Sequence, residues 1–111
     1  MSLENQVWRL LTEIEQLMQE STLWNPVPPA LTAFDSHEPF CIDTMEPEEW
    51  LQWVFIPRMR AILESEQPLP TNIAITPYFE VSFAKRSGDF QPLIAALQNI
   101  DQVLNKENNQ C

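Results

Sequence analysis

Hydrophobic positions near the N-terminus recur in alternating steps of four and three residues, which is the spacing of one face of an α-helix. These positions are Leu3, Val7, Leu10, Ile14 and Leu17. Charged and amide residues occupy most of the positions between them, so the pattern predicts an amphipathic helix over about residues 2–23, with Ser2 as its N-cap. Three prolines within residues 26–29 end this helix, because proline lacks the amide that an α-helix needs.

Residues 25–43 follow as a long connection in which no helical or strand pattern repeats. Such a loop is uncommon inside a compact domain and calls for a reason. It carries five apolar side chains spaced like anchors: Val27, Leu31, Phe34, Phe40 and Ile42. The simpler interpretation is that these side chains pack across the helices. The alternative is a functional lid or a docking segment for a partner.

A second helix is predicted to begin near Asp43 and Thr44, either of which can cap it, and to continue to about Ser65. Its apolar residues point in almost all directions, so we expect this helix to be the central element, covered on most sides. Pro57 lies inside it and predicts a kink, because the carbonyl of Trp53 loses its donor. The side chains expected to be mostly buried are Leu51, Val54, Phe55 and Ile62.

Two shorter helices are predicted in the remaining sequence. Thr76 and Pro77 suit the N-cap and first turn of a helix that reaches about Lys85. Gly88 and Asp89 then suit a helix stop and the next N-cap, before an apolar stripe that ends at Leu104. The polar stretch 105–111 is expected to fray. The sequence therefore predicts an all-α, four-helix, bundle-like single domain over residues 1–111, with a kinked central helix and a long proline-rich loop after the first helix.

Charge is distributed unevenly along the 111 residues. The net charge is −10, and residues 1–50 hold ten acidic residues against one basic residue, Arg9. A protein that grips nucleic acid by its phosphates needs a Lys/Arg surface, so direct nucleic-acid binding is not expected. The acidic half either reflects an ordinary acidic domain or steers the protein towards a basic partner. Glu46, Glu48 and Glu49 are the candidate steering surface.

Glycine and cysteine content restricts the chemistry further. One glycine, Gly88, cannot supply a phosphate-binding loop, a dinucleotide-binding turn or a nucleophile elbow. Cys41 and Cys111 cannot make a disulfide framework and are expected to stay reduced. The N-terminus resembles no signal peptide, and the longest apolar run is far too short to span a membrane, so we expect a cytoplasmic protein without membrane contact.

The candidate catalytic groups favour structural roles. Glu46, Glu48 and Glu49 are typical of a helix N-terminus, and no histidine completes a metal site with them. His37 lies four residues before Cys41, but the negative surroundings disfavour a thiolate. We therefore expect no catalytic residue, no metal and no cofactor, and a protein that is not an enzyme.

Aromatic residues form the constellation with the most functional interest. Trp50, Trp53 and Pro57 recur at helical spacing, and Tyr78 follows in the next helix. Large aromatic side chains mostly supply core area, but they also line pockets and anchor interfaces. Arg58 and Glu80 are expected to form an ion pair that fixes the third helix against the second.

Residues 43–59 read DTMEPEEWLQWVFIPRM, and QPLP at 67–70 and PYFE at 77–80 follow. In these motifs and in length the chain resembles the YqcC-like family, small bacterial proteins that form a domain of unknown function. The resemblance implies an all-α, four-helix domain with no established activity. It also implies an association, because genes of the family often lie beside that of a tRNA pseudouridine synthase.

Two functional hypotheses follow. The first is a non-enzymatic interaction or accessory module, whose candidate partner is a basic RNA-modifying enzyme such as a tRNA pseudouridine synthase. The alternative is a domain that binds a small molecule in an aromatic-lined pocket near Trp50, Trp53 and Tyr78.

Overall fold

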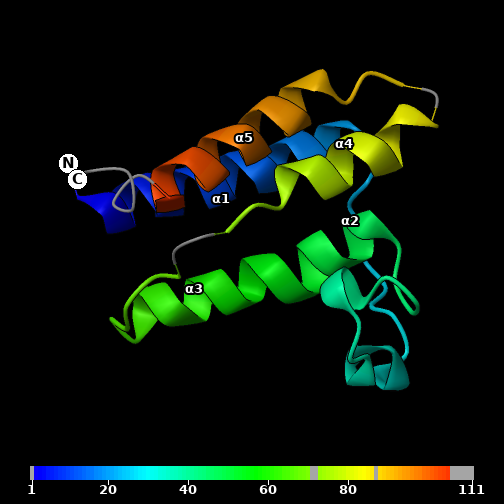
Figure 1. Cartoon of the computed structure of the whole chain (residues 1–111), viewed down its shortest axis with the longest axis horizontal. Helices are drawn as coiled ribbons and strands as arrows, with labels where there is room; N and C mark the ends of the chain where they lie inside the picture. Colours follow the sequence, from blue (N-terminus) through cyan, green and yellow to red (C-terminus); the bar gives the residue numbers. More distant parts are fainter. Residues whose placement is uncertain (1, 71–72, 87, 106–111) are drawn as a thin grey trace.

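Four helical stretches carry the fold in the computed structural model, which describes residues 2–70, 73–86 and 88–105 (Figure 1). They are α1 (Leu3–Glu20), one continuous stretch made of α2 (Pro47–Trp50), η3 (Leu51–Phe55) and α3 (Ile56–Glu64), then α4 (Thr76–Ala84) and α5 (Gln91–Asn105). Two 3₁₀ turns, η1 (Leu31–Asp35) and η2 (Pro39–Cys41), precede α2. No strand occurs within these described ranges, so the predicted all-α class is confirmed. The predicted fraying beyond Asn105 lies outside the described residues.

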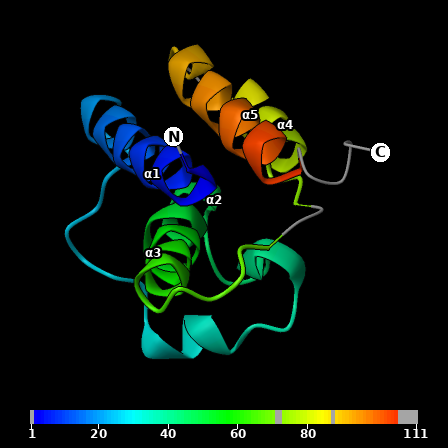
Figure 2. The same cartoon turned by 90° about the vertical axis from the view of Figure 1, so that its left-hand side faces the viewer.

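α1 is the helix that the others pack around. It contacts α5 along its length and also contacts α3, while α4 packs on α5 (Figure 2). The predicted cap is present, since the Ser2 hydroxyl accepts a hydrogen bond from the Asn5 amide at 3.2 Å. The fully buried side chains of α1 are Val7, Leu11, Ile14 and Met18. The amphipathic pattern thus located the helix. Its buried face takes Val7 and Ile14 from the predicted stripe, while Leu3, Leu10 and Leu17 are only half-buried.

The second helical stretch is covered on fewer sides than predicted. α3 lies between α1 and η1 in Figure 2, but Pro57 and Arg58 are exposed. Val54 and Ile62, which we expected to be mostly buried, are only half-buried. One side of the stretch supplies the core, with Leu51, Phe55, Ile56 and Met59 buried. Apolar residues all around a helix therefore do not show that every side is covered.

The irregularity expected at Pro57 takes the form of a π-helical segment. Residues of η3 keep helical backbone angles, but the Ile56 amide donates to the carbonyl of Leu51, five residues back. The extra residue in this turn brings Phe55 and Ile56 onto the face of Leu51. A widened turn directly before a proline lets the helix continue although Pro57 has no amide to donate.

The start of this stretch also differs from the sequence prediction. Glu46, and not Asp43 or Thr44, is the N-cap, and the Glu49 side chain accepts from the Glu46 amide at 2.8 Å to complete a capping box. The Thr44 hydroxyl instead donates to the Ala33 carbonyl at 2.8 Å. Thr44 is therefore used to fasten the preceding loop rather than to start the helix.

The N-terminus of α4 is capped by a residue from another helix. Thr76 was expected to be the cap, but Ile75 occupies that position and Thr76 is already helical. The Asp101 carboxylate of α5 accepts from the amides of Ile75 and Thr76 at 3.1 and 2.9 Å, and from the Thr76 hydroxyl at 2.7 Å. A carboxylate at a helix N-terminus is stabilised by both the free amides and the helix dipole. This contact joins α4 to α5.

Burial in the second helical stretch predicts unequal effects of an introduced charge. Leu51→Asp should lower the free energy of unfolding by more than about 3 kcal/mol, because a carboxylate would lie in the core without a partner. Val54→Asp, three residues on, should lower it by less than about half as much, since water reaches that side chain. Urea denaturation followed by circular dichroism measures both values. Equal losses would contradict the burial difference.

The inter-helical cap predicts a second pair of effects. The carboxylate of Asp101 accepts three hydrogen bonds, and Asp101→Asn removes its charge and one of its two acceptor oxygens. The free energy of unfolding should therefore fall by about 1–2 kcal/mol. Asp89→Asn is the matched control, because Asp89 is exposed and, among the described residues, accepts a hydrogen bond from the Gln91 amide alone, at 3.1 Å. Denaturant titration should show a distinctly smaller loss for Asp89→Asn. A loss for Asp101→Asn no larger than for Asp89→Asn would mean that the cap is not important.

Candidate functional site

Trp50 and Tyr78, two of the predicted site residues, meet through a third ring. Phe40 of η2 stacks on Tyr78 with ring centroids 4.3 Å apart and meets Trp50 edge-on at 4.8 Å. Phe55 and Phe79 extend this aromatic cluster towards the core, at 5.4 and 6.2 Å from Trp50. Such pairs stabilise a structure by about 0.5–1.5 kcal/mol beyond the area they bury. The cluster therefore fastens η2 to α2 and α4.

The backbone of η2 is strained where it delivers Phe40 to the aromatic cluster. Phe40 and Cys41 have φ angles of 60° and 48°, in the left-handed region that side chains other than glycine rarely adopt. Strain of this kind persists only where surrounding contacts impose it. Here the stacked ring of Phe40 supplies that contact.

Burial raises the pKa of Tyr78 above its ordinary value, because the phenolate would be poorly solvated in the cluster. The nearby carboxylates of Glu46 and Glu48 raise this pKa further. Tyr78 is thus held neutral, and its ring serves in packing. Nothing in this arrangement prepares Tyr78 to act as a base.

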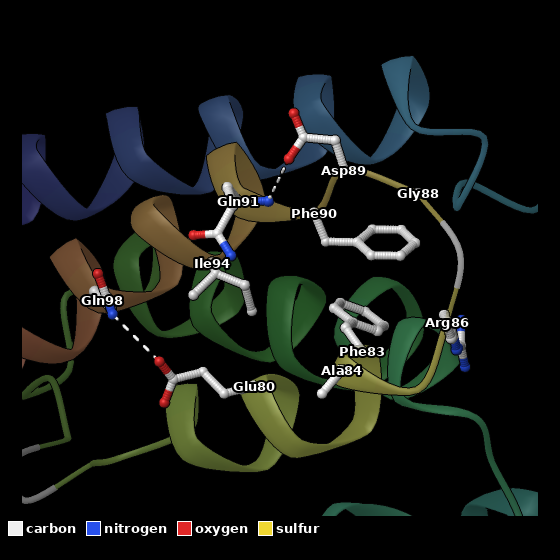
Figure 3. Close-up of a pocket in the computed structure, with 10 residues that line it drawn as sticks. All are labelled: Glu80, Phe83, Ala84, Arg86, Gly88, Asp89, Phe90, Gln91, Ile94 and Gln98. Carbon is white, nitrogen blue, oxygen red and sulfur yellow. Dashed lines mark hydrogen bonds between the residues drawn. The ribbon is translucent and has the colours of Figure 1, made fainter.

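The rings of the aromatic cluster pack against one another. A groove of about 360 Å³ lies between α4 and α5, where Phe83 and Phe90 stack at 4.7 Å (Figure 3). Its polar rim includes Glu80, which accepts from Gln98 at 3.5 Å, and Arg86. Trp50, Trp53 and Tyr78, the residues of the alternative ligand pocket, do not line this groove.

The remaining predicted site residues are not brought together. Trp53 is half-buried, and its indole Nε1 is buried without a hydrogen-bond acceptor within the described chain. The predicted Arg58–Glu80 ion pair is wrong, because Glu80 accepts from Gln98 and Arg58 is exposed on α3. The basic residues that do join helices are Arg60 and Arg86. Arg60 lies 45 residues from the acid it binds, and Arg86 lies about 40 residues from its two acids. Pairs so far apart in the sequence leave no recognisable pattern in it.

Arg86 lies between two of the three candidate steering acids. Its Nη2 is 3.2 Å from Glu46 and 2.9 Å from Glu48, and its Nη1 donates to Glu48 at 3.0 Å. The hydrogen bond to Glu48 raises the pKa of the Arg86 guanidinium, which stays charged. Glu49 caps its own helix. These acids therefore hold the start of α2 against the end of α4.

Catalytic and metal-binding groups do not converge in the part of the chain that the structure describes. No three His, Cys, Asp or Glu side chains are placed there to hold a metal ion. His37 is exposed and Cys41 is half-buried on the next turn. The sequence prediction that the protein is not an enzyme stays a prediction.

The apolar side chains of residues 25–43 do not pack as the simpler interpretation requires. Only Phe40 joins the core region, whereas four others are exposed: Val27, Leu31, Phe34 and Ile42. In Figure 1 the 3₁₀ turns η1 and η2 lie near the start of α2, outside the layer formed by α1, α4 and α5. A loop that exposes this much apolar surface needs another explanation.

The ion pairs of Arg86 predict different effects for neighbouring acids. Glu48→Gln should lower the free energy of unfolding by about 1 kcal/mol, because the Glu48 side chain is only 20% exposed and bonds directly to the guanidinium. Glu46→Gln should change it little, because that side chain is 69% exposed. Thermal and urea unfolding of the two variants make the comparison. If Glu48→Gln loses no more stability than Glu46→Gln, the bond between Arg86 and Glu48 does not tether α2.

Comparison with known proteins matches the chain over most of its length. A family model described as DUF446, tRNA pseudouridine synthase C, covers residues 6–103. An uncharacterised protein from Haemophilus influenzae is 48% identical over 98% of this chain and 100% of its own. The uncharacterised protein YqcC from Escherichia coli is 40% identical over 93% of this chain and 94% of its own length.

A third relative and a solved structure complete the comparison. A protein from Pectobacterium carotovorum named tRNA pseudouridine synthase C is 60% identical over 70 residues, which are 63% of this chain and 19% of that protein. The solution NMR structure of YqcC from Escherichia coli matches the fold with a TM-score of 0.82 and 38% identity, covering 94% of this chain and 89% of the other. The resemblance seen in the sequence motifs is therefore confirmed, and the chain belongs to the YqcC-like (DUF446) family.

Proposed function

We propose that the protein is a non-enzymatic interaction module that binds a tRNA pseudouridine synthase. One observation carries the proposal: a segment 60% identical to this chain makes up 19% of a protein named tRNA pseudouridine synthase C. When two binding modules are joined in one chain, each has a high effective concentration near the other. Such a fusion is an advantage for two modules that act together. A family domain inside the enzyme therefore supports contact between a separate family domain and the enzyme.

The chemistry of the described residues agrees with a binding role. Titratable side chains near the aromatic cluster are engaged in packing, capping and ion pairs, and a hydrolytic or transfer reaction needs convergent groups that remain free to act. Within those residues there is also no metal cluster that could replace them. The tRNA chemistry is therefore assigned to the synthase and not to this chain.

Charge gives the module a way to find such a partner. An enzyme that binds tRNA presents a positive surface, whereas residues 1–50 of this chain hold ten acidic residues and one basic residue. Opposite charges accelerate encounter between proteins. Glu46 and Glu48 both pair with Arg86, and Glu46 is the more exposed of the two.

The proposal includes a cytoplasmic location, because its candidate partner is an enzyme that acts on tRNA. It also includes a protein partner and no direct contact with nucleic acid. Among the described helices, none has the length and apolar character to cross a bilayer.

Binding to the tRNA pseudouridine synthase C of the same organism tests the proposal. The full-length chain should bind the enzyme with a dissociation constant below about 10 µM at 50 mM salt. The association rate should fall at 500 mM salt, because the Debye length shortens from roughly 14 Å to about 4 Å. Stopped-flow fluorescence can follow association through the tryptophans of this chain. No complex at 50 µM of each protein would reject the proposal.

Two controls give this result its meaning. An unrelated basic RNA-binding protein should bind more weakly by at least about tenfold, because charge attraction alone carries little specificity. The chain without the enzyme should form no pseudouridine in tRNA. Pseudouridine formation by the chain alone would overturn its assignment as a non-enzyme.

A further inference from the structure

Three of the exposed apolar side chains lie on one lobe of the molecule, formed by residues 30–45. Leu31 and Phe34 are one 3₁₀ turn apart on η1, which puts their side chains on the same side of the turn. Ile42 directly follows η2. Leu31 is 87% exposed, Ile42 is 56% exposed and Phe34 is 39% exposed. We call Leu31, Phe34 and Ile42 the lobe patch.

The lobe is held in a defined shape although it lies outside the core. The Thr44 hydroxyl donates to the Ala33 carbonyl, and the Ser36 hydroxyl donates to the Asp43 carboxylate, so the two sides of the lobe are joined. Phe40 fixes η2 to the aromatic cluster. A backbone that is already ordered loses little conformational freedom on binding, which is an advantage for an interface.

Acidic residues lie next to the lobe patch in the sequence. Asp35, Glu38 and Asp43 are exposed next to it in the chain, and no lysine or arginine occurs between Arg9 and Arg58. Apolar side chains inside a charged rim are the usual anatomy of a protein interface. The sign of the rim specifies the partner, because an acidic rim pairs with a basic one and repels nucleic acid.

We infer that the lobe patch docks into an apolar groove with a basic rim on the tRNA pseudouridine synthase. This inference rests on the proposed function. Leu31 and Ile42 enter the groove and supply most of the contact energy. Asp35 and Glu38 face its basic residues and accelerate encounter. A second copy of this chain fits less well, because two acidic lobes would repel each other.

Binding of full-length variants to the purified synthase tests the docking surface. The double variant Leu31→Ser/Ile42→Ser should weaken binding at least about tenfold, because it removes two apolar anchors. Both side chains are exposed, so the melting temperature should stay unchanged. Val81→Ser is the matched control, since Val81 is 66% exposed on α4, and it should bind within about twofold of the wild type.

A second pair of variants tests the acidic rim. Asp35→Asn/Glu38→Gln should slow association at 50 mM salt and converge with the wild type at 500 mM salt. Glu64→Gln/Glu66→Gln removes the same charge at the opposite end of α3 and should slow association much less. Equal slowing by both pairs would reject the lobe as the place where charge acts.

The outcomes separate this inference from the proposed function. A wild type that does not bind the synthase rejects both the function and the docking surface. A wild type that binds, together with a Leu31→Ser/Ile42→Ser variant that binds equally well, rejects the docking surface and leaves the function standing. Analytical ultracentrifugation of the chain alone provides one further outcome. A dimer that this double variant dissociates would assign the lobe patch to a second copy and overturn the inference.

Discussion

The packing of α1 against α5 is the contact on which the other elements depend. Each helix has one face that is entirely apolar, and those faces bury their side chains against each other and against the remaining helices. Hydrophobic burial on this scale is the main favourable contribution in a domain of about 110 residues. α3 and α4 are then attached by specific polar contacts as well as by packing. Arg60 of α3 bonds to Glu15 at 2.7 Å and stacks over Trp8, and Asp101 of α5 caps α4.

Local sequence signals determined the helices but not their arrangement. Periodicity located α1 and α5 because a stripe of apolar residues repeats along each, and Ser2 caps a helix through residues only three positions away. Asp101 and Arg86 were missed because their partners are about 25 and 40 residues distant, and spacing carries no trace of such contacts. Burial around the second helical stretch was overestimated for a related reason. Trp53 and Val54 made every side of that stretch apolar, but both are only half-buried.

Residues 25–43 show why an apolar loop cannot be assigned to the core from sequence. Phe40 packs because η2 accepts two residues at positive φ, a backbone cost that the ring contacts offset. Leu31, Phe34 and Ile42 are equally apolar, yet they remain in water. Hydrophobicity alone does not separate these two outcomes. The separation comes from Thr44 and Ser36, whose hydrogen bonds turn the loop back on itself before its apolar side chains can reach a helix.

The basic residues of the fold sharpen the charge contrast of the lobe. Arg60 bonds to Glu15, and Arg86 bonds to Glu46 and Glu48, so each joins a later helix to an acidic residue of the N-terminal half. These pairs neutralise acids beside α1 and α2, where charge would otherwise oppose the packing of helices. Asp35 and Glu38 lie farther out, in a stretch of sequence with no lysine or arginine. Arg60 and Arg86 are engaged in these internal ion pairs, and none of the ion pairs among the described residues involves Asp35 or Glu38 beside the exposed apolar side chains. A surface that combines acidic and apolar side chains is complementary to an apolar groove with a positive rim, and a nucleic-acid backbone offers no such groove.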